Sequence, residues 1–214
     1  MSTSELPDEA GARVAWVISA PTQDELRRRY DLWAHSYEAD LGRVEDYLAP
    51  IATADVAKVH LPGDARILDA GAGTGLSGQA LRDAGFSDLT ALDFAEQMLA
   101  VAAEKGIYRA TIAADLTRRT PLDDDAFDAV VTVGTTSQIP GESLREYVRV
   151  TRPGGKIIVA NWVKAWNEQG YAAIQAAFER DGKLALIEQG EPFQALPTTE
   201  PEIVYEIWVF EVRG

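Results

Sequence analysis

The pattern of hydrophobic and polar positions changes near residue 63. After Asp64, short apolar runs alternate with amphipathic stretches, which is typical of strands and helices that repeat over a parallel sheet. The apolar runs predict strands over residues 65–70, 89–93, 110–113, 127–133 and 156–161. The stretches between them predict helices over residues 75–84, 95–104 and 142–151, with Pro153-Gly154-Gly155 as the turn into the next strand. This part of the chain is therefore predicted to be an α/β unit.

The end of the chain adds a different connection to this unit. Residues 166–181 predict one helix, and two β-like runs follow at 184–189 and 203–212. The segment between these two runs is too short to hold a crossover helix. We therefore expect an antiparallel hairpin at one edge of the sheet, connected through Pro197-Thr198-Thr199-Glu200-Pro201.

The chain before residue 63 has a helical pattern. Thr22 with Glu25 three residues later is typical of a capping box at a helix start. One helix is predicted from that cap through a stripe of apolar and aromatic residues, Leu26, Tyr30, Trp33 and Tyr37.

A second helix is predicted over residues 44–60, bent near Pro50. Residues 1–20 stay unassigned, because their one apolar stretch suits either a short helix or a docked arm. The chain is thus predicted to have two parts, a helical preface over 1–62 that acts as a lid and an α/β core over 63–214.

Charge and composition exclude several kinds of site. The chain has 34 acidic and 20 basic residues, a formal net charge of −14, which argues against a nucleic-acid partner. Its longest basic run, Arg27-Arg28-Arg29, is predicted to be a solvated helix face. Cysteine is absent and only His35 and His60 supply imidazoles, so we expect no disulfide and no metal site. No apolar stretch is long enough for a membrane span and the start is polar and acidic, so we expect a cytoplasmic protein without a membrane partner.

The most informative segment follows the first predicted strand. Residues 67–75 form an apolar strand that ends in a glycine loop, with Asp69 on the strand followed by Gly71, Gly73 and Gly75. Glycines let the backbone approach a ligand closely, and such a loop at the carboxyl end of the first strand is where doubly wound folds bind nucleotides.

Three acidic residues around this loop suggest which nucleotide it binds. Asp93 ends the next strand and is placed to accept hydrogen bonds from both hydroxyls of a ribose. Asp69 gains nothing from a pyrophosphate but suits a ligand with an ammonium group, and Asp115 after the third strand suits an adenine amino group. Residues 73–78 also match the dinucleotide pattern G-x-G-x-x-G, so an NAD-dependent oxidoreductase stays open as an alternative.

At these residues the chain resembles the class I S-adenosylmethionine-dependent methyltransferases, which carry an acid-x-G-x-G-x-G loop. Further segments that resemble the family are Ala91-Leu92-Asp93-Phe94, Gln97-Met98-Leu99, Phe127-Asp128-Ala129-Val130 and Arg152-Pro153-Gly154-Gly155-Lys156. The resemblance implies an α/β Rossmann-like, doubly wound sheet of seven strands, mostly parallel with an antiparallel last strand. It also implies S-adenosyl-L-methionine as cofactor, bound by Asp69, Gly71, Gly73, Gly75, Asp93, Phe94, Met98, Asp115, Leu116 and Gly134.

The preface carries a narrower resemblance. Residues 30–38 and 47–50 look like the preface of small-molecule methyltransferases similar to the Williams-Beuren-region methyltransferase-like proteins. In that group the preface helices cover the cofactor, which implies that Tyr37 lies near its methionine end. The segment Val133-Gly134-Thr135-Thr136-Ser137-Gln138 departs from the group, whose members often have a histidine there.

These features predict methyl transfer by in-line displacement to a small-molecule acceptor. His35, beside Tyr37, is the candidate general base because imidazole titrates near neutral pH. Asn161, Trp162 and Trp166 after the fifth strand are candidate walls of an acceptor pocket. A relative that binds the cofactor without methylating, as a cyclase or binding partner, is a further alternative, and aromatic residues near the chain ends permit a homodimer.

Overall fold

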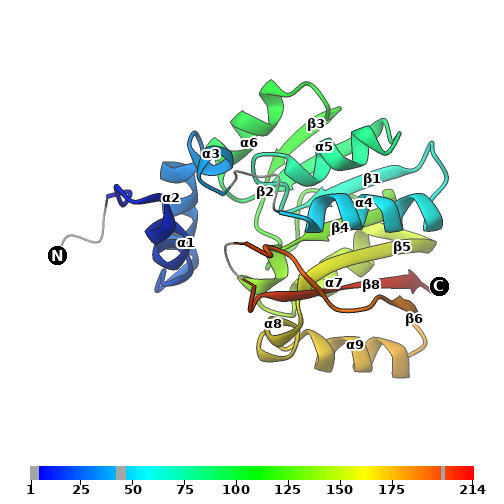
Figure 1. Ribbon diagram of the computed structural model, residues 1–214. Helices are drawn as coiled ribbons and strands as arrows, with labels where there is room; N and C mark the ends of the chain where they lie inside the picture. The colour runs from blue at the N-terminus through cyan, green and yellow to red at the C-terminus, as the bar shows by residue number, and fades with distance from the viewer. Residues whose placement is uncertain (1–4, 42–46, 199–200) are drawn as a thin grey trace.

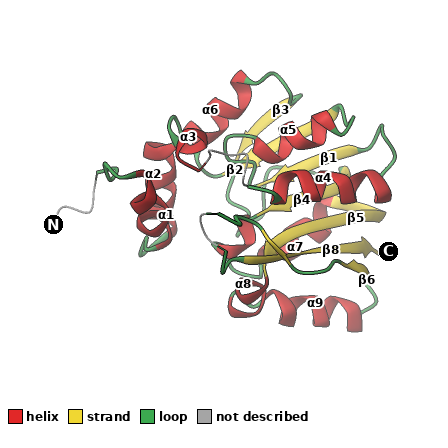
Figure 2. Cartoon of the chain, viewed as in Figure 1, coloured by secondary structure: helices red, strands yellow, loops and turns green. Residues whose placement is uncertain are grey.

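The computed structural model describes residues 5–41, 47–198 and 201–214, and its centre is one β-sheet with helices on both faces (Figure 1, Figure 2). The strand order is β3-β2-β1-β4-β5-β8-β6, with the short β7 paired to β8. The strands are β1 (Arg66–Ala70), β2 (Asp88–Asp93), β3 (Ala110–Ala113), β4 (Phe127–Val133), β5 (Thr151–Trp162), β6 (Leu184–Gln189), β7 (Phe193–Gln194) and β8 (Val204–Val212).

The pairing of the strands confirms the predicted sheet. Strands β1 to β5 pair in parallel, and β8 is antiparallel to both β5 and β6. The last strand therefore lies between β5 and the edge strand β6, as the predicted hairpin requires. The two-residue β7 was not predicted, because a strand of that length leaves no periodic pattern in the sequence.

Side-chain alternation along the strands builds a core on each face of the sheet. Ile67 and Leu89 pack with α4 (Ala49–His60) and α5 (Leu76–Asp83), and α6 (Glu96–Glu104) lies on the same face. Leu68 and Leu92 point to the other face, where they pack with α7 (Ser143–Val150), α8 (Val163–Glu168) and α9 (Tyr171–Arg180). Because both faces of these strands are buried, their sequences are continuous apolar runs.

Two predicted boundaries after residue 140 differ from the structure. Strand β5 begins at Thr151, and the segment predicted as a turn lies inside it as a bulge, because the register with β4 jumps between Phe127 and Ala129. The helix predicted over 166–181 is two helices, α8 and α9, separated at Gly170, whose φ is +84°. A positive φ cannot continue an α-helix, so the chain changes direction there.

The N-terminal helices lie beyond the carboxyl ends of the parallel strands (Figure 1). They are α1 (Ala10–Ile18), α2 (Gln23–Trp33) and α3 (Tyr37–Leu41). The hydroxyl of Thr22 accepts a hydrogen bond from the Glu25 backbone N–H at 3.2 Å, which confirms the predicted cap. The predicted single helix through Tyr37 is wrong, because the chain turns after Trp33, whose indole N–H donates to Asp40 at 2.6 Å. Of the second predicted helix, α4 begins at Ala49, and residues 44–46 lie outside the described residues.

The basic run Arg27-Arg28-Arg29 on α2 is only partly the solvated helix face that the sequence predicted. Arg27 is exposed, but Arg29 is only 4% exposed and donates to Glu25, to the Ser19 hydroxyl and to the Trp16 backbone carbonyl. Its guanidinium also lies 5.1 Å from the centre of the Trp16 ring. Arg29 therefore fastens α1 to α2, a contact that local sequence patterns do not reveal.

Candidate functional site

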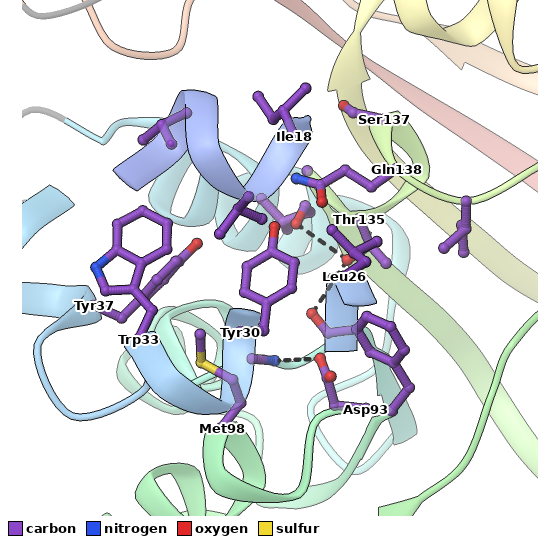
Figure 3. A pocket seen from close by; sticks show the side chains of 18 of the residues that line it. Ile18, Leu26, Tyr30, Trp33, Tyr37, Asp93, Met98, Thr135, Ser137 and Gln138 are labelled. Atoms are coloured by element: carbon purple, nitrogen blue, oxygen red, sulfur yellow. Dashed lines mark hydrogen bonds between the residues drawn. The ribbon is translucent and has the colours of Figure 1, made fainter. Parts of the chain in front are cut away.

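A cavity of about 220 Å³ opens where the carboxyl ends of β1, β2, β4 and β5 face the N-terminal helices (Figure 3). Segments far apart in the sequence line it, from α1 and α2 to the start of β8. Carboxyl ends of parallel strands are where open α/β sheets bind ligands. The position of the cavity therefore identifies the candidate site.

The glycine loop after β1 forms the floor of this cavity. Gly71, Gly73 and Gly75 have φ values of +76°, +54° and +90°, a region of backbone space that favours glycine. A Cβ built on Gly71 would lie 2.1 Å from the Thr135 hydroxyl oxygen, whereas one on Gly73 meets no atom within 4 Å. Gly71 thus lets β1 pass close to the segment after β4, and Gly73 exposes backbone to open space. Gly75 is the N-cap residue of α5 and does not line the cavity.

Asp93 stands at the end of β2 and faces the loop. Its carboxylate accepts from the Gly73 backbone N–H at 2.8 Å and from the Ala95 N–H at 2.9 Å. The group is 7% exposed, and burial raises the pKa of Asp93 to about 6 although these N–H groups oppose the shift. The remaining lone pairs of this carboxylate border the cavity, so it can accept hydrogen bonds from a ligand there.

Asp69 lies below the loop instead of in the cavity. It is fully buried, and it accepts hydrogen bonds from the Ser77 hydroxyl at 2.7 Å and the Tyr108 hydroxyl at 2.6 Å. Burial raises the pKa of Asp69 to about 6. The expected service of Asp69 to an ammonium group, indirectly or through the loop, stays a prediction, and its oxygens are already bonded within the protein. Its role in this structure is to hold the loop against α5.

The predicted adenine end is assembled from two further segments. Asp115 and Leu116 follow β3, and Phe94 and Met98 follow β2; all four line the cavity. Asp115 Oδ1 accepts from the Thr117 backbone N–H at 2.8 Å and hydroxyl at 2.7 Å, which fixes the carboxylate at the cavity wall. These residues give the cavity an apolar slot with a carboxylate at its rim.

Aromatic rings from the N-terminal helices cover the cavity. The ring centres of Tyr30 and Tyr37 lie 6.3 Å apart, and those of Tyr30 and Phe94 lie 6.2 Å apart. Loss of hydration raises the pKa of Tyr30 and Tyr37 above the usual phenol range, so both stay protonated at neutral pH. Tyr37 lines the cavity together with Gly71 and Gly73, and its place near the methionine end of the cofactor stays a prediction.

The structure brings most of the predicted site residues together. The predicted residues that line the cavity are Tyr37, Gly71, Gly73, Asp93, Phe94, Met98, Asp115, Leu116 and Gly134, together with Trp162 from the candidate acceptor wall. His35 is exposed and is not among the residues that line the cavity, and α2 has ended two residues earlier. The structure therefore does not support His35 as a general base for a ligand in this cavity.

Other cavity residues were missed by sequence reasoning. They include Val14, Val17 and Ile18 from α1, Gln138 after β4, and Tyr205 from β8. Gln138 was visible only as part of the segment that departs from the resembled family. The three residues of α1 belong to the apolar stretch that the sequence left as a short helix or a docked arm, and Tyr205 reaches the cavity through long-range packing, for which a single sequence has no local signal.

Two kinds of site are absent from the part of the chain that the structure describes. No group of three or more His, Cys, Asp or Glu side chains is placed to hold a metal ion. No described helix is long and apolar enough to cross a membrane.

Comparisons with known proteins agree on one kind of domain. Residues 68–159 match the family model for a methyltransferase domain. Methyltransferase-like protein 27 of Homo sapiens is 33% identical over 178 residues, which cover 80% of this chain and 72% of that protein. The demethylmenaquinone methyltransferase of Beutenbergia cavernae is 38% identical over 141 residues, which cover 65% of this chain and 55% of that enzyme.

The fold has a close structural counterpart. The crystal structure of the [4+2]-cyclase SpnF superposes with a TM-score of 0.69 at 19% identity, covering 91% of this chain and 97% of that one. At this identity the likeness concerns the fold alone. It shows that the N-terminal helices and the sheet together form an arrangement found in a solved structure.

Proposed function

This chain belongs to the class I S-adenosylmethionine-dependent methyltransferases, and we propose that it transfers the methyl group to a small-molecule acceptor held in the cavity under α1 and α2. Its cofactor is S-adenosylmethionine. The observation that carries the proposal is the convergence of the Gly71 to Gly73 loop, the Asp93 carboxylate and a mainly apolar cavity at the carboxyl ends of the strands.

The residues present fit this cofactor. Gly73 borders open space with no atom within 4 Å of a built Cβ, so a ligand can lie directly against the backbone. The buried Asp93 carboxylate would hold the ribose hydroxyls, and Asp115 would hold the adenine amino group, with Leu116 and Met98 against the ring. The methionine end would then extend along the loop toward Tyr37.

The chemistry needs positioning more than acid or base groups. When bound, the sulfonium cofactor supplies an electrophilic methyl group, which an acceptor atom can attack in line. The chain's own residues orient the acceptor and exclude water, which can account for much of the lowering of the barrier. Tyr30 and Tyr37 stay protonated and serve as hydrogen-bond donors near the reacting atoms.

A small acceptor is favoured by the size of the cavity, about 220 Å³, which aromatic side chains of α2 and α3 help to line. The net charge of −14 opposes a nucleic-acid strand as acceptor. Family membership argues against the nicotinamide-dependent alternative. The division at residue 62, a homodimer and a cytoplasmic location stay predictions from the sequence.

Calorimetric titration tests the cofactor site. We expect S-adenosylmethionine and S-adenosylhomocysteine to bind the purified protein and NAD not to bind. The Asp93→Ala variant should weaken both sulfur ligands about 100-fold or more, because two hydrogen bonds to a buried carboxylate are lost. Asp88→Ala is the matched control, since Asp88 stands at the opposite end of β2 and pairs with Arg109.

Each other outcome has a definite meaning. Binding of NAD alone, or unchanged affinity in Asp93→Ala, would contradict the assignment of this cavity to the cofactor. Binding of S-adenosylmethionine with no release of S-adenosylhomocysteine over a wide panel of small acceptors would favour a non-methylating relative instead.

A further inference from the structure

Apolar side chains outside the proposed cofactor-binding residues line much of the cavity. They include Val14, Val17 and Ile18 of α1, together with Trp162 and Ile203. Ile18 is 60% exposed, although it is a large aliphatic residue at the cavity mouth. Walls of this kind favour an acceptor with a large apolar surface.

The charged side chains that line the cavity are acidic. Asp93 and Asp115 line the cofactor end, and no Lys, Arg or His is found among the described residues that line the cavity. An anionic acceptor would therefore lose its hydration without gaining a cationic partner. The charge distribution favours a neutral acceptor.

Gln138 supplies a polar group of the cavity lining that has unused bonding capacity. Its backbone is fixed, because its N–H donates to the Thr135 carbonyl at 3.0 Å and its own carbonyl accepts from the Gln23 side chain at 3.2 Å. Its side-chain amide lies beside the Tyr30 hydroxyl (Figure 3). Its Oε1 atom is buried and has no hydrogen-bond partner.

A buried carbonyl oxygen without a partner is unfavourable, and a ligand that donates a hydrogen bond to it relieves that cost. Gln138 lines the cavity, and because its buried Oε1 has almost no exposed surface, the side-chain amide must turn toward the cavity for a bound molecule to reach this atom. We propose that the acceptor is a neutral, mainly apolar molecule bearing a hydroxyl or N–H group, and that Gln138 Oε1 accepts a hydrogen bond from that group. The proposal rests on the proposed function and names its substrate class and a specificity-determining residue.

Three naphthalene probes of similar shape test the proposal. They are 2-naphthol, which can donate a hydrogen bond, 2-methylnaphthalene, which cannot, and 2-naphthoate, which is anionic. Each is titrated into wild-type protein saturated with S-adenosylhomocysteine, and the emission of Trp33 and Trp162 at the cavity wall reports binding. The Gln138→Met variant keeps the length of the side chain and removes its carbonyl. Gln79→Met, on the outer side of α5, is the matched control.

We expect 2-naphthol to bind wild-type protein at least tenfold more tightly than 2-naphthoate does. Gln138→Met should weaken 2-naphthol by roughly tenfold and change 2-methylnaphthalene less than twofold, since one hydrogen bond is removed and the apolar walls stay. Gln79→Met should change neither.

Three results would overturn the proposal. They are 2-naphthoate binding as tightly as 2-naphthol, Gln138→Met weakening both neutral probes equally, and no binding of either neutral probe. The titration of S-adenosylhomocysteine that precedes each experiment keeps two failures apart. If wild-type protein does not bind S-adenosylhomocysteine, the proposed function is contradicted. If it binds S-adenosylhomocysteine but the three probes give one of the results above, only this inference is contradicted.

Discussion

Two buried aspartates near the glycine loop show how neighbours decide the role of a residue. Asp69 and Asp93 both end up in apolar surroundings that raise the pKa of each to about 6. The oxygens of Asp69 are bonded to Ser77 and Tyr108, so this carboxylate supports the loop from below. Asp93 borders the cavity and keeps bonding capacity for a ligand. The same chemical group thus serves structure at one position and binding at the other.

The raised pKa of Asp93 predicts a pH dependence of cofactor affinity. Only the ionised carboxylate can accept hydrogen bonds from two ribose hydroxyls, and protonation begins as the pH falls toward about 6. The Kd for S-adenosylhomocysteine should be constant above pH 7 and rise about tenfold per pH unit below pH 6, measured by calorimetry from pH 5 to 8. In Asp93→Asn the affinity should be low and nearly independent of pH. A flat profile in the wild-type protein would show that Asp93 does not titrate on binding.

Gly71 gives a second prediction at the residue scale. An alanine there combines a φ of +76° with a Cβ that would lie 2.1 Å from the Thr135 hydroxyl oxygen, so β1 and the segment after β4 must separate. Gly71→Ala should lower the melting temperature strongly and abolish cofactor binding. Gly106→Ala is the control, because Gly106 has a φ of +65° and open space around it. That variant should lower the free energy of unfolding by about 1 kcal/mol, which is the strain of a positive φ alone. Equal losses in the two variants would refute the importance of the close approach.

Among the helices and strands, those whose position is set by neighbouring residues were predictable from the sequence, and those set by distant contacts were not. Strands β1, β2 and β4 were predicted within one residue at each end, because burial on both faces leaves continuous apolar runs. Breaks in helices were not predicted, because the turns after Trp33 and at Gly170 depend on a distant bond to Asp40 and on one positive φ. The loop glycines and Asp93 form a local motif, so the cofactor end was predictable. The acceptor end was not, since α1 and β8 meet there only after folding.

Tyr108 links three elements and gives a prediction about them. It follows α6, packs against Gly75 and Gly78 of the loop and α5, and donates to Asp69 of β1 at 2.6 Å. Tyr108→Phe should lower the free energy of unfolding by about 1.5–3 kcal/mol at pH 7.5, because a buried hydrogen bond to a charged group is lost. Urea titration measures this change.

Tyr171→Phe is the comparison, since the Tyr171 hydroxyl bonds to the neutral Ser143 hydroxyl at 2.5 Å in the other core. That loss should be smaller, about 0.5–1.5 kcal/mol. A larger loss in Tyr171→Phe than in Tyr108→Phe would mean that Asp69 is not the charged partner that the structure indicates.

At the scale of the whole molecule, the arrangement joins a two-faced α/β core to helices that cover its binding edge (Figure 2). Helices α1 to α3 are fastened to one another through Arg29 and through Asp40, which accepts from both Arg13 and Trp33. Their polar contacts with the core include Gln97 N–H to Asp31 at 2.9 Å and the ion pair of Lys105 with Glu38 at 2.7 Å. These helices are thus built as one unit that docks on the core beside the cavity.

The shared partner Asp40 makes the integrity of that unit testable. Asp40→Ala leaves the buried Trp33 indole N–H and the Arg13 guanidinium without this acceptor, which should loosen α1 and α3 while the sheet and α7 to α9 stay unchanged. Hydrogen–deuterium exchange should therefore accelerate in residues 10–18 and 37–41 alone, and the Kd for S-adenosylhomocysteine should rise because Tyr37 loses its support. Asp24→Ala, which removes an exposed pair with Arg27 at 3.3 Å, should change neither quantity. If exchange rises across the sheet as well, α1 to α3 are part of the cooperative core. If exchange rises only in these helices and affinity does not change, the helices cover the cavity without contributing to cofactor binding.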